Sequence, residues 1–392
     1  MGKNREFDVV VYGATGFTGR LVAEYLNAQY GVGGDLKWAM AGRSDKKLAQ
    51  VRDEMGISKD VPFVVADASD PASLKAMAER TSVVLTTVGP YQMYGSDVVA
   101  ACAEAGTDYV DLCGETPWMR WVIDTHSATA EKTGARIVLS CGFDSIPFDL
   151  GVFFLQDEAK KKFGSTVPRV KTRVRAMKGT FSGGTVASFR STMAEAGKNP
   201  DVIKILQDHF ALTPGFSGPP QPEGNKPEYD EGLGMWLAPF VMAPINTRNV
   251  HRSNALLGHA YGKDFVYDEM MLAGPGEQGE AIAKMIAGDT SLMSDDAPKP
   301  GEGPSKKERE EGMYDVLIIG ESGDGKTIKV GVTGDRDPGY GSTSKIIAEA
   351  AVCLAKDDVV EGGGIYTSAP AMGLTLVNRL VANAGLTFKV EG

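Results

Sequence analysis

Residues 7–19 of this chain read FDVVVYGATGFTG, and this stretch decides the fold. A β-branched apolar run ends in a glycine turn, and a helical pattern follows at residues 20–26. In such a strand–turn–helix unit, Gly13 permits the tight turn, Gly16 lets the backbone approach phosphates, and Gly19 allows close packing of helix on strand. The G-x-x-G-x-x-G spacing is a variant common in enzymes that use the phosphorylated dinucleotide. The residues that we expect to bind a dinucleotide pyrophosphate are Gly13, Ala14, Thr15, Gly16, Phe17, Thr18 and Gly19.

Strand and helix patterns alternate regularly through the first third of the chain. The six candidate strands are Phe7–Tyr12, Lys37–Ala41, Pro62–Asp67, Ser82–Val88, Asp108–Leu112 and Arg136–Cys141. The pairs Asp70-Pro71 and Thr116-Pro117 are typical helix starts, with a capping side chain before a proline in the first turn. This order predicts an α/β fold with a doubly wound parallel Rossmann sheet, and we assign residues 1–142 to a dinucleotide-binding domain.

The pattern changes after Phe143. Val167–Met177 alternates charged and apolar residues, which is typical of a strand in a half-exposed antiparallel sheet. A hairpin is expected from Tyr314 to Gly334 and helices near residues 344–355 and 371–384, whereas Thr213–Gly234 and Ser294–Gly312 are expected to be loops. We assign residues 143–392 to a second α/β domain with a mostly antiparallel sheet, and we leave open that its C-terminal helices pack back on the first domain.

Charge and composition exclude several partner classes. The net charge of −10 disfavours nucleic acid as a partner. The four cysteines form no C-x-x-C pair and the four histidines no H-x-x-x-H pair, so we expect reduced thiols and no metal site. Only six residues precede the first strand and no apolar run is long enough to span a bilayer, so we expect a cytoplasmic protein without a transmembrane segment. Peripheral lipid association and a homodimer stay open.

The end of the second strand bears on the choice of cofactor. NAD sites usually place an acidic residue there, whereas NADP sites place a cation. Here Gly42, Arg43 and Ser44 follow the strand, so we expect the Arg43 fork and the Ser44 hydroxyl to bind a 2′-phosphate. The alternatives are a solvated Arg43 and an NAD site built on Asp45. Further expected cofactor contacts are Asp67 at the adenine and Thr87, Val88, Gly89 and Pro90 along the nicotinamide.

Two other motifs are excluded as sources of activity. Residues 320–327 match the phosphate loop G-x-x-x-x-G-K-[ST], but an alternating β-branched segment follows where that loop needs a helix. We therefore interpret the match as a hairpin turn and reject ATPase activity. None of the twelve tyrosines precedes a lysine by four residues, so the Tyr-x-x-x-Lys pair of short-chain dehydrogenases is absent from the sequence.

Four ordered segments make the sequence resemble a known family. They are Gly13–Gly19, TVGPY at residues 87–91, DYVDLCGE at residues 108–115 and GFDSIPFDLG at residues 142–151. The chain resembles the saccharopine dehydrogenase-like oxidoreductases, in the bacterial branch that includes trans-acting enoyl reductases of lipid and polyketide assembly. Further strings of that branch are GEGPS at 301–305, DPGYG at 337–341 and AGLTF at 384–388. The resemblance implies an NADP-type Rossmann domain, an α/β substrate domain and a cofactor cleft between them.

Three residues beyond the strand ends are candidates for catalysis. Tyr91 follows the fourth strand and is either a proton donor or a packing residue beside Pro90. Glu115 is either an acid or a partner of the helix dipole. Asp144 is either catalytic or the cap of the helix that follows it. Tyr91 is the first choice as donor, because a phenol stays protonated at neutral pH.

Substrate contacts are expected from the second domain. Backbone N–H groups in Ser182, Gly183, Gly184 and Thr185 could bind a carboxylate or thioester oxyanion, or they could form an ordinary capped turn. Arg252 is expected to bind an anionic group. The sequence thus predicts an NADP-dependent oxidoreductase, with NAD also open, that reduces an enoyl lipid or polyketide-type acyl substrate. The alternatives are an amino-acid oxidoreductase like saccharopine dehydrogenase and a non-catalytic NADP-binding sensor or scaffold.

Overall fold

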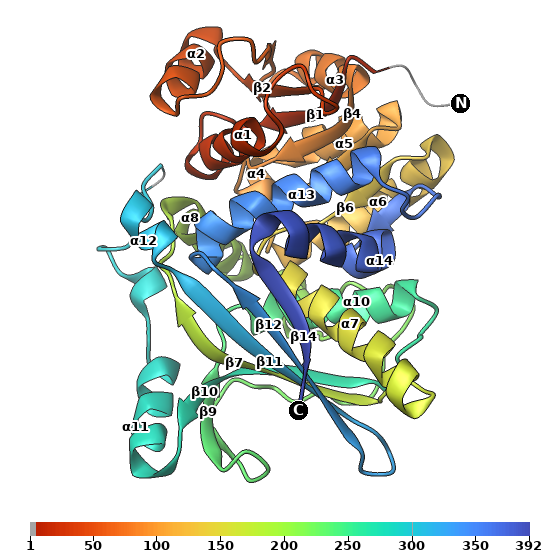
Figure 1. Ribbon diagram of the computed structural model, residues 1–392, viewed down its shortest axis with the longest axis vertical. Helices are drawn as coiled ribbons and strands as arrows, with labels where there is room; N and C mark the ends of the chain where they lie inside the picture. The colour runs from red at the N-terminus through yellow and green to blue at the C-terminus, as the bar shows by residue number, and fades with distance from the viewer. Residues whose placement is uncertain (1–4, 300) are drawn as a thin grey trace.

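The first sheet is parallel and has seven strands in the order β13–β6–β5–β4–β1–β2–β3 (Figure 1). The computed structural model describes residues 5–299 and 301–392, so the expected N-terminal residues 1–4 and residue 300 of the expected loop lie outside the described part. The strands are β1 (Phe7–Tyr12), β2 (Trp38–Gly42), β3 (Phe63–Val65), β4 (Thr81–Thr86), β5 (Asp108–Val110), β6 (Arg136–Val138) and β13 (Gly364–Tyr366). The predicted doubly wound parallel sheet is confirmed, and β13 is an addition from the far end of the chain.

Helices cover both faces of this sheet. Buried side chains of α1, α2 and α13 form one apolar layer, and those of α3, α5 and α6 form the other. Asp70 caps α3 by accepting the Ala72 N–H at 3.1 Å, as its sequence predicts. The predicted cap at Thr116 is wrong, because Thr116 is the first residue of its helix and Glu115 is the N-cap. The helices are α1 (Phe17–Tyr30), α2 (Asp45–Glu54), α3 (Pro71–Arg80), the short α4 (Tyr91–Tyr94), α5 (Ser96–Ala105), α6 (Thr116–Thr133) and α13 (Thr343–Lys356).

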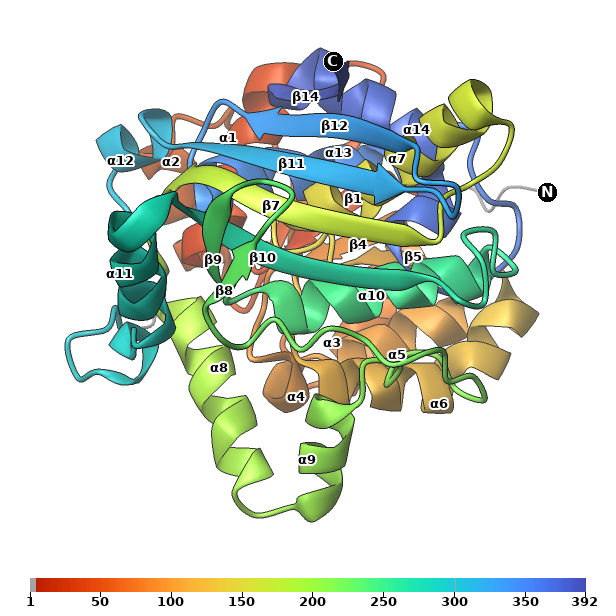
Figure 2. The same ribbon diagram turned by 90° about the horizontal axis from the view of Figure 1, so that it is seen from below.

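The second sheet is mixed and mostly antiparallel, in the order β14–β12–β11–β7–β10–β9–β8 (Figure 2). Only the β7–β10 pair is parallel among the pairings of the described residues. The strands are β7 (Arg169–Lys178), β8 (Glu228–Asp230), β9 (Met235–Pro239), β10 (Val266–Gly274), β11 (Met313–Glu321), β12 (Thr327–Gly334) and β14 (Leu386–Glu391). The predicted strand near Val167–Met177 and the predicted hairpin are thus confirmed.

Helices of the second half connect the two sheets. Figure 1 shows α7, α10, α13 and α14 between them, and one continuous apolar core runs from the first sheet through these helices to the second. Figure 2 shows α8 and α9 extending away from the body. The helices are α7 (Ile146–Phe163), α8 (Gly183–Ala196), α9 (Pro200–Gln207), α10 (Ala243–Leu256), α11 (Gly276–Ala287), α12 (Lys306–Glu310) and α14 (Ser368–Arg379), with short turns at Ser291–Met293, Pro338–Ser342 and Leu380–Ala384.

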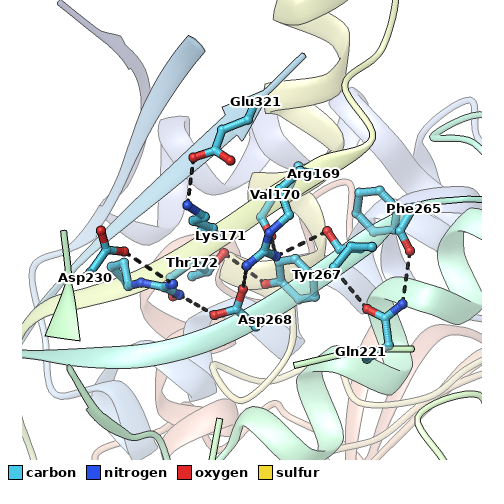
Figure 3. A network of polar contacts seen from close by, with 12 residues as sticks. Arg169, Val170, Lys171, Thr172, Gln221, Asp230, Phe265, Tyr267, Asp268 and Glu321 are labelled. Carbon is cyan, nitrogen blue, oxygen red and sulfur yellow. Dashed lines mark hydrogen bonds and ion pairs between the residues drawn. The ribbon is translucent and has the colours of Figure 1, made fainter. Parts of the chain in front are cut away.

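Ion pairs tie the central strands of the second sheet together (Figure 3). Arg169 and Arg173 of β7 both bind the Asp268 carboxylate on β10. The Arg173 guanidinium lies 2.7 Å from that carboxylate. Lys171 binds Glu321 of β11 at 2.8 Å. Asp268 and Arg173 are almost fully buried, so loss of Asp268 would leave the buried Arg173 with only the more distant Asp230, at 3.9 Å, as an ionic partner among the described residues.

Two segments expected to be loops contain regular secondary structure, and the structure also settles the phosphate-loop match. The expected loop Thr213–Gly234 contains β8, and the expected loop Ser294–Gly312 contains α12. The phosphate-loop match at residues 320–327 spans a turn between β11 and β12, so no helix begins there. No helix among the described residues is long and apolar enough to cross a membrane. The division at residue 142 stays a proposal, since β13 and α13 both join the first sheet.

Candidate active site

The glycine turn lies where the strand order of the first sheet reverses, between β1 and β4. Gly13 has φ +90°, and a Cβ there would lie 2.7 Å from a Val88 methyl carbon. A Cβ on Gly19 would lie 2.1 Å from the Gly13 carbonyl oxygen. Both positions therefore require glycine, the first for its backbone conformation and the second for close packing. In doubly wound folds this crevice is where dinucleotides bind.

The start of α1 is open toward this crevice. Its N-cap is Gly16, which supplies no capping side chain, so the first N–H groups of the helix have no side-chain acceptor. The Phe17 ring packs against the Tyr340 ring, with their centroids 5.2 Å apart. Free N–H groups and the helix dipole suit a pyrophosphate, so the structure fits the expected role of residues 13–19.

Arg43 lies exposed directly after β2, at the expected ribose end of the site. Its guanidinium forms no ion pair or hydrogen bond with the described residues, which leaves its fork available. Ser44 caps α2 by accepting the Lys47 N–H at 3.4 Å, and Asp45 is the first residue of that helix. One oxygen of Asp67 accepts both the N–H and the hydroxyl of Ser69 at 2.9 Å. These hydrogen bonds hold the pKa of Asp67 below its usual range.

The loop after β4 forms the opposite side of the crevice. The Thr87 hydroxyl donates to the Gly13 carbonyl at 3.4 Å, so residues 87–90 lie beside the glycine turn. A Cβ on Gly89 would lie 3.7 Å from the Ser188 hydroxyl oxygen. The first turns of α8 therefore face the expected nicotinamide end of the site.

Glu115 anchors this loop. Its two carboxylate oxygens accept the N–H groups of Tyr91 at 2.9 Å and Gln92 at 2.8 Å, at the start of α4. Ser188 also hydrogen-bonds the carboxylate. Burial raises the pKa of Glu115, and the hydrogen bonds partly offset that rise. The carboxylate thus complements the N-terminus of α4 rather than that of its own helix.

Tyr91 is held by backbone groups on both sides of its hydroxyl. The phenol donates to the Thr86 carbonyl at 3.3 Å and accepts the Leu112 N–H at 3.0 Å. Burial, with a smaller contribution from the Asp111 charge, raises the pKa of Tyr91 well above its usual value. With both hydrogen-bonding functions occupied, the geometry favours the packing interpretation of Tyr91 over the proton-donor one.

Asp144 does not cap α7, so that interpretation is wrong. The N-cap is Ser145, and Asp144 forms no side-chain hydrogen bond with the described residues. Burial raises the pKa of the Asp144 carboxyl to about 6. The Asp144 charge contributes to a raised pKa of Tyr340, which places the two groups near each other.

Tyr340 is a candidate that sequence reasoning missed. Its phenol oxygen accepts the Ser182 N–H and lies 2.9 Å from the Thr185 hydroxyl. Either hydroxyl of this pair can be the donor, so the phenol proton of Tyr340, unlike that of Tyr91, is not bound to a backbone carbonyl of the described residues. Burial raises the pKa of Tyr340, although these hydrogen bonds lower it in part. The ring touches Phe17 of the glycine turn, so the phenol lies between that turn and α8. The available signal was the string at residues 337–341, which we used only for the family resemblance.

The backbone at the start of α8 is occupied internally. The Ser182 N–H binds Tyr340, the Gly183 N–H donates to the Glu302 carbonyl at 3.1 Å, and the Gly184 N–H donates to the Ser182 hydroxyl at 3.2 Å. This geometry favours the capped-turn interpretation of Ser182–Gly184. The Thr185 hydroxyl remains a candidate contact through its pairing with Tyr340.

Arg252 is buried and bound to backbone, away from the crevice. Its guanidinium donates to the carbonyls of Leu212 at 2.6 Å and Ile365 at 2.5 Å. Ile365 belongs to β13, which is four strands from β1 in the sheet. At about 4.8 Å per strand, the guanidinium lies roughly 19 Å from the glycine turn. The expected substrate-binding role of Arg252 is therefore not supported, because its donors hold the chain together.

A glycine turn at the strand reversal, with Tyr340 and Asp144 beside it, is typical of an NAD(P)-dependent oxidoreductase. The saccharopine dehydrogenase NADP binding domain matches residues 9–138. A trans-acting enoyl reductase of Mycobacterium ulcerans is 40% identical over 405 residues, which cover 96% of each chain. The chain therefore belongs to the saccharopine dehydrogenase-like family, in the branch of the trans-acting enoyl reductases.

Further relatives agree with this placement. A Mycobacterium tuberculosis protein, provisionally named a trans-acting enoyl reductase, is 42% identical over 98% of this chain and 97% of its own length. Among solved structures, saccharopine dehydrogenase (L-Glu forming) of Saccharomyces cerevisiae is similar with a TM-score of 0.54 and 11% identity, over 98% of this chain and 100% of that one. At that identity the likeness shows the fold alone.

Proposed function

We propose that this enzyme uses NADPH to reduce the C=C bond of an enoyl thioester of the lipid or polyketide type. The relatives that span the whole chain are named trans-acting enoyl reductases, and this observation carries the proposal. When bound, NADPH supplies a hydride. The residues that would hold it are those of the 13–19 turn, the 87–90 loop and the 42–44 segment, with Asp67 at the adenine.

Preference for NADPH is supported by the state of Arg43. The guanidinium is exposed at the end of β2 and forms no hydrogen bond or ion pair with the described residues, although its charge acts on the nearby Asp67 carboxylate. A 2′-phosphate could therefore take both arms of its fork. Asp45, the residue of the NAD alternative, occupies the first position of α2, where a carboxylate complements the helix dipole.

Reduction of an enoyl thioester also needs a proton at the carbon next to the carbonyl. We propose that Tyr340 delivers it, with Thr185 positioned on its hydroxyl and Asp144 close by. The raised pKa keeps the phenol protonated at neutral pH. Glu115 and Tyr91 are proposed to position the 87–90 loop, because both are hydrogen-bonded to backbone there.

The substrate assay compares two reaction classes of the family. NADPH consumption is measured with enoyl thioesters and, separately, with 2-oxo acids plus lysine or glutamate. We expect turnover with the enoyl thioesters. Turnover only on the amino-acid side would reverse the proposal, and tight NADPH retention without turnover on either side would favour a sensor or scaffold. We further propose a cytoplasmic location, and a homodimer stays a prediction.

A further inference from the structure

A cavity lies beside the first turn of α8. Its volume is about 660 Å³, within the range of small-molecule sites. The apolar side chains that line it include Phe181, Val186, Leu292 and Pro304. Val186 and Pro304 are buried, and Phe181 and Leu292 are half-buried, so the apolar atoms form the inner wall.

This cavity shares its walls with the proposed reaction site. Val186 lines the cavity and directly follows Thr185, whose hydroxyl pairs with Tyr340. Gly303 also lines the cavity and packs against Phe17 of the glycine turn. A Cβ on Gly303 would lie 2.5 Å from the Phe17 ring. The cavity and the phenol of Tyr340 therefore lie next to each other, at the first turn of α8 and beside Phe17.

We propose that this cavity binds the apolar chain of the acyl substrate, with the reacting end near Tyr340. The inference rests on the proposed function for the identity of the reacting end. It adds a binding site for a long hydrocarbon chain, and it predicts that the enzyme discriminates substrates by chain length.

The charges at the rim support a chain rather than a charged head group. Asp296, Glu302 and Glu308 lie exposed on the lining of the cavity. Three carboxylates among the lining residues disfavour a phosphate or a carboxylate in the cavity. An uncharged chain end experiences no such repulsion, so the anionic carrier of the substrate would remain on the cleft side.

The outer wall is attached to α8 and continues as apolar surface. Arg190 donates to the carbonyls of Leu292 at 3.3 Å and Ser294 at 2.5 Å, which fastens the wall to the helix. Beyond the wall, Phe189, Met193 and Met293 are 36%, 47% and 56% exposed. An acyl chain longer than the cavity would contact these side chains where it emerges, so affinity can keep rising with chain length beyond the cavity itself.

The test uses chain length and one cavity-filling variant of the full protein. Ala297 is half-buried in the cavity lining, and Ala297→Phe fills part of the volume. Ala194→Phe makes the same change at an exposed position of α8 outside the lining and serves as the control. For the wild type and Ala194→Phe, kcat/KM for enoyl N-acetylcysteamine thioesters should rise about three- to fourfold per added methylene until the cavity is full. In Ala297→Phe the rise should stop at shorter chains, with the C4 substrate unchanged.

A binding measurement separates this inference from the proposed function. Saturated dodecanoyl- and butanoyl-N-acetylcysteamine are titrated by calorimetry in the presence of NADP. We expect at least tenfold tighter binding of the longer chain, and its loss in Ala297→Phe, even if no enoyl substrate is turned over. Equal binding of both chains, or an unchanged length profile in Ala297→Phe, would overturn the inference while leaving enoyl reduction intact. A fall in NADPH affinity of Ala297→Phe would instead assign the cavity to the cofactor and also overturn it.

Discussion

Replacement of Arg43 with alanine should separate the affinities for the two nicotinamide cofactors. The exposed guanidinium is not hydrogen-bonded to any described residue, and the nearby Asp67 carboxylate is bonded to Ser69 instead. In the alanine variant all hydrogen bonds of Arg43 to a 2′-phosphate would be lost. Hydrogen bonds to charged groups contribute about 1.5–3 kcal/mol, which corresponds to a roughly 10- to 100-fold weaker NADPH complex. NADH lacks the 2′-phosphate, so its affinity should change by less than about twofold.

Fluorescence titration at fixed ionic strength measures both affinities. Lys59→Ala is the matched control, because Lys59 is an exposed cation that precedes β3, at the amino-terminal end of the parallel strands, whereas Arg43 follows the carboxyl end of β2. It should leave both affinities unchanged. Since the interaction is exposed, the effect of Arg43→Ala should shrink as salt increases. Equal loss of NADPH and NADH binding, or no loss at all, would refute the assignment of Arg43 to the 2′-phosphate.

Four further changes test the site. Gly19→Ala places a Cβ 2.1 Å from the Gly13 carbonyl oxygen, so it should lower stability by about 1–3 kcal/mol in urea unfolding and weaken NADPH binding about tenfold or more. Tyr340→Phe should lower turnover roughly 100-fold with NADPH affinity intact. Tyr91→Phe should cost about 1–3 kcal/mol of stability, because it leaves the partly buried N–H of Leu112 unpaired, and turnover should stay within a few-fold of wild type. If Tyr91→Phe abolished turnover and Tyr340→Phe did not, the donor role would return to Tyr91. Asp144 has its pKa raised to about 6, so the folded state binds more protons than the unfolded state between about pH 4 and 6, and stability falls as pH rises through that window. The unfolding free energy of Asp144→Asn minus that of the wild type should therefore rise by about 3 kcal/mol between pH 4 and pH 7.5. A difference that does not change with pH would show that the carboxyl titrates normally.

Much of the fold follows from local patterns in the sequence. The strand after residue 7, the helix starts at Pro71 and Thr116, and the β11–β12 hairpin all carry signals within a few residues. β13 does not, because its three residues follow a glycine run and it becomes a strand only by pairing with β6, far away in the chain. Such long-range pairing leaves no periodicity to read.

The site divides in the same way. The cofactor-binding residues can be predicted from sequence because each directly follows a strand, and the carboxyl ends of parallel strands lie at the same edge of the sheet. Side-chain partners are less readable, since they are set by packing. Tyr91 and Asp144 both follow strands, yet one is fixed between backbone groups and the other lies near Tyr340, some 200 residues later. Arg252 looked like a ligand-binding cation and instead holds two backbone carbonyls.

Transfer of label from the cofactor tests the central claim most directly. NADPH carrying deuterium at the pro-R or the pro-S position of nicotinamide C4 is incubated with the enzyme and an enoyl thioester, and the product is analysed by mass spectrometry and NMR. We predict a saturated thioester with one deuterium at the β-carbon, delivered from only one of the two labelled cofactors. A product without deuterium, or label found only in an amine formed from a 2-oxo acid and an amino acid, would contradict the assignment of this enzyme as an enoyl reductase.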